Sequence, residues 1–140
     1  MSAENKALVS RWFEEVWTKG RAELIEELLA ADSSVYGLGP DLHGAAAFKP
    51  FYAAYRTAFP DVAVRIDDVI AEGDIVAARW TATGTHQGDG LGFPATGKKV
   101  RFTGMVFVRV ANGKMIEGWN SFDQLGMLQQ LGVVNLPEAV

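Results

Sequence analysis

The stretch from Trp80 to Gly132 constrains the fold of this chain more than any other. Two runs in which polar and apolar residues alternate, 98–110 and 114–122, are separated by the pair Asn112-Gly113. An Asn-Gly pair favours the type I′ turn of a β-hairpin, because both central positions of that turn need positive φ. A glycine-rich loop over 86–97 precedes this hairpin, and a leucine-rich segment after it predicts a short terminal helix.

The first sixty residues predict helices. Apolar residues at i, i+4 spacing predict an amphipathic helix over 3–19, and a second helical pattern covers 21–31. Polar residues and glycines over 32–40 then predict a loop. A third helix carries its aromatic residues on one face over 48–59, and Pro50 should either start this helix or kink it.

After Pro60 the apolar period changes to two. Val62, Val64 and Ile66 predict one strand, and a Glu-Gly-Asp turn leads into a second strand over 75–86. Helices followed by antiparallel strands are typical of an α+β fold, and we expect one domain over residues 1–140. The predicted architecture is a cone-shaped, curved antiparallel sheet wrapped over the N-terminal helices. Such a cone has an apolar interior suited to a hydrophobic small molecule.

Composition excludes several kinds of protein. The net charge is −4, and the charged residues are scattered along the chain rather than grouped in runs. Because there is no basic stripe to bind phosphates, we expect no nucleic-acid partner. With no cysteine, two histidines and no clustered carboxylates, we expect no metal and no cofactor. No apolar run is long enough to cross a membrane, and the charged N-terminus is unlike a signal peptide. We therefore expect a cytoplasmic protein.

Asp123 is the first candidate for chemistry, because it stands where the last strand meets the last helix. As an N-cap, its carboxylate would accept hydrogen bonds from the first helical turn, and this interpretation is favoured. The alternative is a general acid or base at the mouth of the cone. His86, at the start of the glycine-rich loop, has two equally weighted interpretations: a structural histidine or a second acid/base group.

Strand alternation divides the residues before Asp123 into two sets. Trp119, Ser121 and Asp123 lie on one face, and Gly118, Asn120 and Phe122 lie on the other. The sequence leaves open which set lines the cone. We name both Asn120 and Trp119 as substrate-binding candidates, since an amide in the cone would orient a carbonyl group but could not transfer a proton.

Other substrate-binding candidates come from the strands and helices around the cone. Arg79 lies in mid-strand and needs a carboxylate partner if it points inward, for which Glu117 and Asp123 are candidates, although an outward orientation is favoured. Aromatic residues are core residues by default, but some should line the cavity. The aromatic candidates are Tyr36, Tyr52, Phe48 and Trp12.

Three segments together resemble a known family: LHGAAAFKPFYAAYRTAFPDVAV, GTHQGDGLGFPATGKKVRFTG and NGKMIEGWNSFDQLGMLQQLG. They are similar to the SnoaL-like polyketide cyclases, an ester cyclase group of the nuclear-transport-factor-two-like superfamily, from Asn5 to about Gly132. The resemblance implies a cone-shaped α+β barrel that often pairs through its sheet. It also implies an aspartate that catalyses an intramolecular aldol closure without metal or cofactor. That aspartate aligns with Asn120 and an assisting histidine aligns near Val106, so this chain departs from the family at both positions.

The leading prediction is a small-molecule enzyme of this type, performing cyclisation, isomerisation or related acid/base chemistry on a hydrophobic, carbonyl-bearing substrate. Asp123 or His86 would transfer the proton. One alternative is a non-catalytic binding domain on the same fold, and the other is a sheet-mediated dimerisation module. We expect a homodimer, because the 98–110 strand carries apolar residues on both faces and a sheet with two apolar faces needs two covers.

Overall fold

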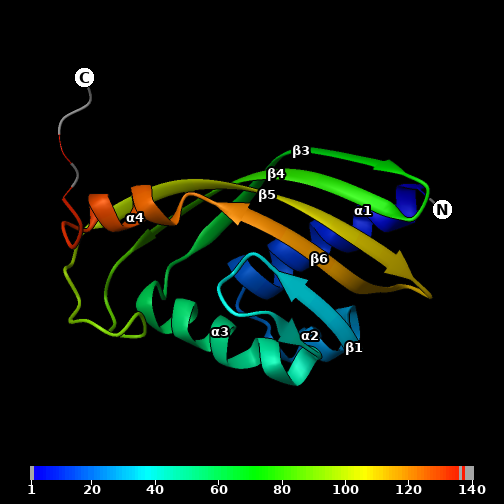
Figure 1. The fold of residues 1–140 in the computed structure, drawn as a ribbon, viewed down its shortest axis with the longest axis horizontal. Helices are drawn as coiled ribbons and strands as arrows, with labels where there is room; N and C mark the ends of the chain where they lie inside the picture. Colours follow the sequence, from blue (N-terminus) through cyan, green and yellow to red (C-terminus); the bar gives the residue numbers. More distant parts are fainter. Residues whose placement is uncertain (1, 136, 138–140) are drawn as a thin grey trace.

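The computed structural model describes residues 2–135 and 137. Its centre is a curved, six-stranded sheet in the order β2-β1-β6-β5-β4-β3, with helices closing the open side (Figure 1). The predicted α+β fold, with a curved sheet over N-terminal helices, is therefore confirmed. The elements in chain order are α1 (Ser2–Arg11), η1 (Trp12–Thr18), η2 (Ala22–Leu24), α2 (Ile25–Leu28), β1 (Leu29–Tyr36), β2 (Leu42–His43), α3 (Ala45–Ala58), β3 (Ala63–Glu72), β4 (Ile75–Thr85), β5 (Lys99–Ala111), β6 (Lys114–Phe122) and α4 (Gln124–Gln130).

The first helix changes its winding halfway along. The α-helix α1 continues into η1, a π-helical segment in which, for example, the Lys19 N–H donates to the Glu14 carbonyl 3.0 Å away. A regular α-helix would turn Trp12 and Trp17, which are five residues apart, well away from each other. The wider π turn brings them towards one side of the helix. The sequence predicted the span of this helix but not its change of winding.

The predicted helix over 21–31 is wrong at its C-terminal end. A short 3₁₀ turn, η2, and the four-residue α2 occupy its first part, and β1 begins at Leu29. The strand forms because β1 pairs with β6, from Leu29 opposite Met115 to Tyr36 opposite Trp119. This pairing across the whole chain overrides the local helical pattern, and no short-range signal in the sequence announces it.

The β1–β6 pairing also corrects the expected sheet. These two strands run parallel, whereas the β1–β2, β3–β4, β4–β5 and β5–β6 pairs are antiparallel. The predicted β5–β6 hairpin is confirmed, with φ of 52° at Asn112 and 74° at Gly113. Along β5 the alternation is regular: Val106 and Val108 are buried on the concave face, and Met105 and Phe107 are exposed on the convex face.

Helix α3 begins at Ala45, so Pro50 lies inside it rather than at its start. The glycine-rich loop packs directly against this helix. The Gln87 N–H donates to the Ala58 carbonyl at the end of α3, and a side chain at Gly90 would begin only 2.1 Å from the Ala54 carbonyl oxygen. The loop therefore uses its glycines for close backbone contact with α3.

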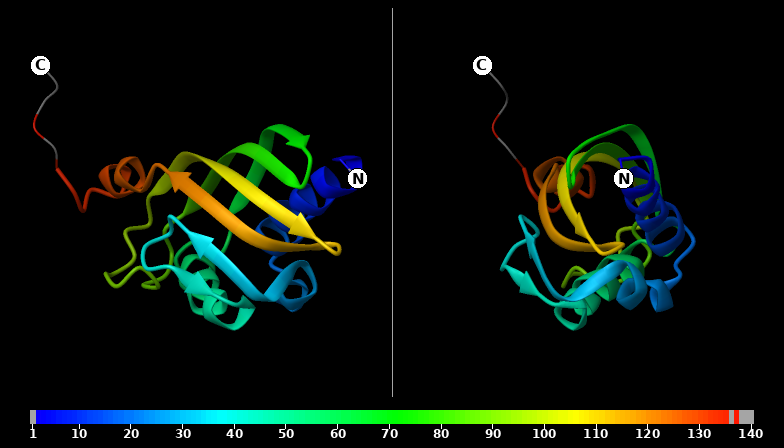
Figure 2. Two further views of the ribbon diagram at one scale, coloured as in Figure 1. Left: turned by 45° about the vertical axis from the view of Figure 1, so that its right-hand side comes forward. Right: turned by 90° about the vertical axis from the view of Figure 1, so that its right-hand side faces the viewer.

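Seen along the barrel, the sheet curls almost all the way round, and α1 and α3 lie across the remaining gap (Figure 2). The apolar interior has two parts. The larger part is formed by α1, η1, α2, α3 and the concave face of the sheet. The smaller lies under α4 and the glycine-rich loop, around Phe59 and Met127. Among the described residues, none of the helices is long and apolar enough to cross a membrane.

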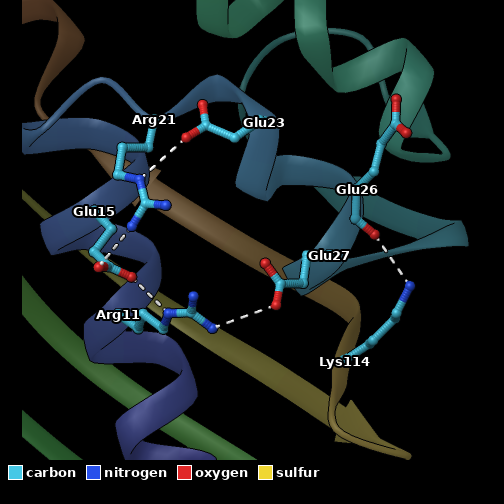
Figure 3. A network of polar contacts seen from close by, with 7 residues as sticks. All are labelled: Arg11, Glu15, Arg21, Glu23, Glu26, Glu27 and Lys114. Atoms are coloured by element: carbon cyan, nitrogen blue, oxygen red, sulfur yellow. Dashed lines mark hydrogen bonds and ion pairs between the residues drawn. The ribbon is translucent and has the colours of Figure 1, made fainter.

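A network of ion pairs covers the outside of the N-terminal helices (Figure 3). Arg11 pairs with Glu15 of η1 at 2.5 Å and with Glu27 of α2 at 3.8 Å, and Arg21 pairs with Glu15 at 3.1 Å. The hydrogen bond from Arg11 is the main reason why the pKa of Glu15 is lowered. Because these groups are exposed, each pair contributes little stability. Through Arg11, these pairs link α1 and η1 to α2 on the side of the barrel that the helices cover.

Candidate functional site

The larger apolar region, together with Val62, Ala82 and Phe102 of the smaller one, lines a cavity of about 110 Å³. A single water needs only about 10–15 Å³ of such space, so the cavity has room for much more than one water molecule. Its wall is formed by the concave face of β4, β5 and β6 on one side. On the other side lie η1, α3 and two residues of β1, Leu29 and Val35. It is the interior of the predicted cone.

Aromatic side chains form the helical wall of this cavity. From η1, Trp12 and Trp17 line it together, which the π-helical winding permits. From α3, the lining residues Phe48, Phe51 and Tyr55 follow at spacings of three and four, as one face of an α-helix requires. The rings of Trp12 and Phe48 are 5.2 Å apart. A flat, apolar molecule would find aromatic contacts along this wall.

Asn120 supplies an amide to the sheet wall. Its Nδ2 atom donates to the backbone carbonyl of Tyr36 at 3.1 Å, which ties β6 to the end of β1. The chain approaches closely here, because a Cβ on Gly37 would lie 1.9 Å from the Asn120 carbonyl oxygen, so no other residue fits without movement. The Asn120 side chain is half-buried and lines the cavity. Of the two strand faces left open by the sequence, the face with Gly118, Asn120 and Phe122 therefore points inward.

Two further polar residues line the cavity. Burial raises the pKa of the Tyr55 hydroxyl, and a hydrogen bond with Gln124 only partly opposes this rise, so the hydroxyl remains a neutral donor at neutral pH. Glu117 also contributes to the wall, but its carboxylate accepts a hydrogen bond from Arg109 Nε at 3.0 Å. Among the described residues, no three His, Asp or Glu side chains are grouped closely enough to hold a metal ion.

The two positions at which the family resemblance implies an acid/base pair are neighbours. Val106 of β5 lies directly opposite Asn120 of β6, and both line the cavity. The sheet therefore brings these positions together inside the pocket, where this chain has a valine and an amide. Neither side chain can transfer a proton.

The two predicted catalytic residues lie away from the cavity wall. Asp123 is the exposed N-cap of α4, where its Oδ1 accepts the Gly126 N–H at 2.9 Å. His86 is fully buried between the rings of Phe59 and Phe93, at 5.6 and 5.1 Å. Its Nδ1 accepts the Thr96 N–H at 3.0 Å, and its buried Nε2 has no hydrogen-bond partner among the described residues. Both geometries match the structural interpretations given above.

Three of the predicted substrate-binding residues do not line the cavity but lie on the convex side of the sheet: Trp119, Tyr36 and Arg79. Trp119 is 37% exposed, and its ring lies 6.1 Å from that of Tyr36. Arg79 also points outward and pairs with Asp68 at 2.7 Å and Asp67 at 3.6 Å. This is the outward orientation that the sequence favoured, and the partners come from neighbouring β3, whereas Glu117 and Asp123 were candidates only for an inward orientation. A bulge at Asp67 brings both aspartates near it, which strand periodicity alone does not reveal.

The remaining predicted residues lie in or near the helical wall. Trp12 and Phe48 line the cavity, but Tyr52 is buried beside it and donates its hydroxyl to the Val16 carbonyl at 2.7 Å. From the sequence, Tyr55 was considered only as one of several core aromatics that could line the cavity, and Trp80 was not proposed as a site residue. The i, i+3, i+7 spacing of Phe48, Phe51 and Tyr55 was the available signal for Tyr55.

Comparison with known proteins identifies relatives along most of the chain. The sequence pattern of the family described as SnoaL-like polyketide cyclase matches residues 7–131. The aklanonic acid methyl ester cyclase of Streptomyces peucetius is 30% identical over 95 residues, which make up 66% of this chain and 65% of that relative. A proposed polyketide cyclase of Acidithiobacillus ferrooxidans has a solved structure with 30% identity and a TM-score of 0.81, covering 92% of this chain and 94% of the other. AclR of Streptomyces galilaeus, a proposed hydroxylase, is 28% identical with a TM-score of 0.85, covering 95% and 98% of the two chains.

Proposed function

This chain belongs to the SnoaL-like polyketide cyclase family, and on that premise we propose that its cavity is the substrate site of a small-molecule enzyme. The substrate is hydrophobic and carries a carbonyl group, and the reaction is cofactor-independent acid/base chemistry such as isomerisation or cyclisation. The observation that carries this proposal is the aromatic cavity with few polar groups, which is the usual character of a small-molecule site.

The charges around the cavity favour a neutral substrate. The described residues that line it include no lysine, arginine or histidine, and the carboxylate of Glu117 is already engaged by Arg109. An anionic ligand would lose its hydration without gaining a cationic partner, which is costly. A ketone or an ester fits the wall better than a free acid.

Tyr55 has the properties needed to activate a carbonyl group. Its neutral hydroxyl can donate to the carbonyl oxygen and stabilise the negative charge that grows there when an α-proton leaves. Solvent would act as the base that removes this proton. The aldol closure that the family resemblance implies would additionally need an acid/base group at position 120, which this chain lacks.

The exchange of α-protons of 2-tetralone with D₂O tests this function, since NMR follows it directly. We expect the protein to accelerate exchange over buffer and Tyr55→Phe to reduce that acceleration about tenfold or more, while binding measured by dialysis changes little. Ser121→Ala, on the convex face of the same sheet, is the matched control. Exchange at the buffer rate with binding retained would contradict an enzyme.

A second candidate function, non-catalytic ligand binding, is favoured by the amide at position 120. The substitution Asn120→Asp tests it on a 1,5-diketone, whose internal aldol closure forms a ring with loss of water. The apolar wall and the Tyr36 carbonyl both disfavour a carboxylate anion here, so the pKa of the introduced acid should be raised towards neutrality. We expect Asn120→Asp to close the ring and the wild type not to do so. Stability relative to the wild type should fall as the pH rises from the ordinary aspartate pKa to that raised pKa and then level off, because the unfolded chain releases this proton before the folded protein does.

Strong ring closure by the wild type would contradict the second candidate function, non-catalytic ligand binding. If Asp123→Asn abolished that closure, Asp123 would have taken over the acid/base role. If both variants closed the ring as well as the wild type, neither residue would be needed for the reaction.

We further propose a homodimer formed through the convex face of the sheet. Phe107 and Met105 of β5 are 58% and 61% exposed there, and Trp119 lies opposite Phe107 on β6. A cluster of large apolar residues of this kind is typical of an interface. We expect light scattering to give a dimer for the wild type and a monomer for Phe107→Asp, which leaves the concave face unchanged. A monomeric wild type at micromolar concentration would rule the dimer out.

A further inference from the structure

The orientation of the Asn120 amide determines what kind of group it offers to a ligand. Its nitrogen and oxygen differ in hydrogen bonding, because the nitrogen only donates and the oxygen only accepts. The Tyr36 carbonyl oxygen, 3.1 Å from Asn120 Nδ2, can only accept. The amide nitrogen must therefore face Tyr36, since two carbonyl oxygens at this distance would repel each other.

The geometry of the strand ends holds this orientation in place. Tyr36 lies opposite Trp119 in the parallel β1–β6 ladder, so its carbonyl is fixed by the sheet. Gly37 follows it and lies against the backbone of Asn120, in a space too small for a Cβ atom. With the Tyr36 carbonyl held there by backbone contacts, the amide cannot exchange its two ends without losing a hydrogen bond.

The acceptor end of the amide has no partner within the described part of the protein. One Nδ2 proton is used by Tyr36, whereas the Oδ1 atom, with two lone pairs, has no hydrogen-bond partner among the described residues. Asn120 lines a wall that is otherwise almost entirely apolar, with Val106 directly opposite it and Phe122 next on the same face. A ligand that fills the cavity and excludes water would leave this oxygen unsatisfied unless the ligand itself donates to it.

We propose that Asn120 selects for a ligand hydroxyl, such as a phenol or an enol, through its Oδ1 atom. This inference deepens the proposed function by naming a second feature of the substrate beside its carbonyl group. On the opposite wall, the neutral hydroxyl of Tyr55 is a donor suited to that carbonyl. The two walls together therefore fit a molecule that carries a hydroxyl and a carbonyl group on a flat apolar frame.

Three bicyclic probes of similar size separate donor from acceptor recognition: 1-naphthol, 1-methoxynaphthalene and 1-tetralone. Equilibrium dialysis against the wild-type protein gives their dissociation constants, which are corrected for partitioning into octanol. We expect 1-naphthol to bind about fivefold to tenfold more tightly than 1-methoxynaphthalene, as one hydrogen bond to a buried acceptor provides. The ketone 1-tetralone has no proton to donate and reports the contribution of the Tyr55 donor alone. Equal corrected affinities would overturn the selection for a hydroxyl but leave the proposed pocket intact. Failure of all three to bind would overturn both.

Two substitutions assign the preference to the acceptor at position 120. Asn120→Leu removes the oxygen, and we expect the preference for 1-naphthol to disappear while 1-methoxynaphthalene still binds. Asn120→Asp keeps an acceptor oxygen in either protonation state, and we expect the preference to remain. Ser121→Ala points outward from the same strand and should behave as the wild type. A preference that survives in Asn120→Leu would overturn the assignment. If Asn120→Leu does not fold, loss of the preference in Asn120→Asp would overturn it instead.

Discussion

The two parts of the barrel interior have the same chemical character but opposite packing. The part between η1, α3 and the middle of the sheet is lined by apolar side chains and is hollow. The part under α4 and the glycine-rich loop is also apolar, but Phe59, Met127 and Leu131 fill it. Apolar composition therefore does not distinguish a ligand site from a core. The difference lies in whether a segment outside the sheet inserts side chains between the walls.

Truncating one large side chain in each part gives the strongest test of this contrast. Phe59 is 1% exposed and packs against His86 and Phe102, so Phe59→Ala should create a new cavity and cost about 3–5 kcal/mol of unfolding free energy. Phe51 is half-buried and already lines the cavity. Phe51→Ala therefore only enlarges that cavity and should cost about 1–2 kcal/mol. Urea denaturation measures both. Equal losses would show that the hollow part is packed as firmly as the filled one.

The glycine-rich loop that covers the filled part provides a second test. Gly90→Ala would place its Cβ 2.1 Å from the Ala54 carbonyl oxygen of α3, so the loop must move off the helix. We expect a loss of about 2–3 kcal/mol. Gly92→Ala is the control, because a Cβ there meets no atom within 4 Å and only its φ of +93° is strained, at a cost of about 1 kcal/mol. A milder effect at Gly90 than at Gly92, in the same denaturation experiment, would contradict this docking.

The smallest expected effect comes from a substitution on the outer side of the sheet, at the hydrogen bond between Thr81 and Asp67. Thr81 Oγ1 donates to Asp67 at 2.6 Å, and with Arg65 it lowers the pKa of that carboxyl. Because the pKa of Asp67 is lower in the folded protein, its ionised carboxylate stabilises the fold at any pH above the ordinary aspartate pKa. This stabilisation is lost as the pH falls through the lowered pKa. Thr81→Val should therefore raise the pKa of Asp67, which carboxyl NMR titration measures, and slightly weaken resistance to acid. An unchanged titration would exclude Thr81 as the main cause.

Local patterns in the sequence predicted most of the sheet and its hairpin. Alternation over 98–122 and the Asn-Gly turn gave β5, β6 and the connection between them with boundaries close to those observed. Strand β1 was missed because its first three residues continue a helical pattern and the polar residues that follow predicted a loop, whereas only its distant partner β6 stabilises it as a strand. Pairing over such a distance leaves no local trace.

The candidate site was predicted less completely than the fold. Alternation correctly grouped Asn120 with Gly118 and Phe122 but could not tell which face was inside, since that depends on how the sheet curves. Asp123 and His86 were chosen for their chemistry, and their environments are fixed by tertiary contacts with α4 and the glycine-rich loop. The roles of the site residues remain predictions for the experiments above.

The parallel contact between β1 and β6 has a consequence for the order in which the protein folds. Tyr36 and Asn120 are separated by 84 residues, yet their hydrogen bond closes the sheet wall of the cavity. Contacts of such long range form slowly, because the intervening chain must lose entropy before they form. During synthesis, β1 must wait for the last strand of the sheet before it can pair. Until then its edge and the aromatic wall of η1 and α3 remain uncovered, which makes this the stage most open to aggregation. The cavity is therefore completed only after β6 has been synthesised, and ligand binding would report that this strand has docked.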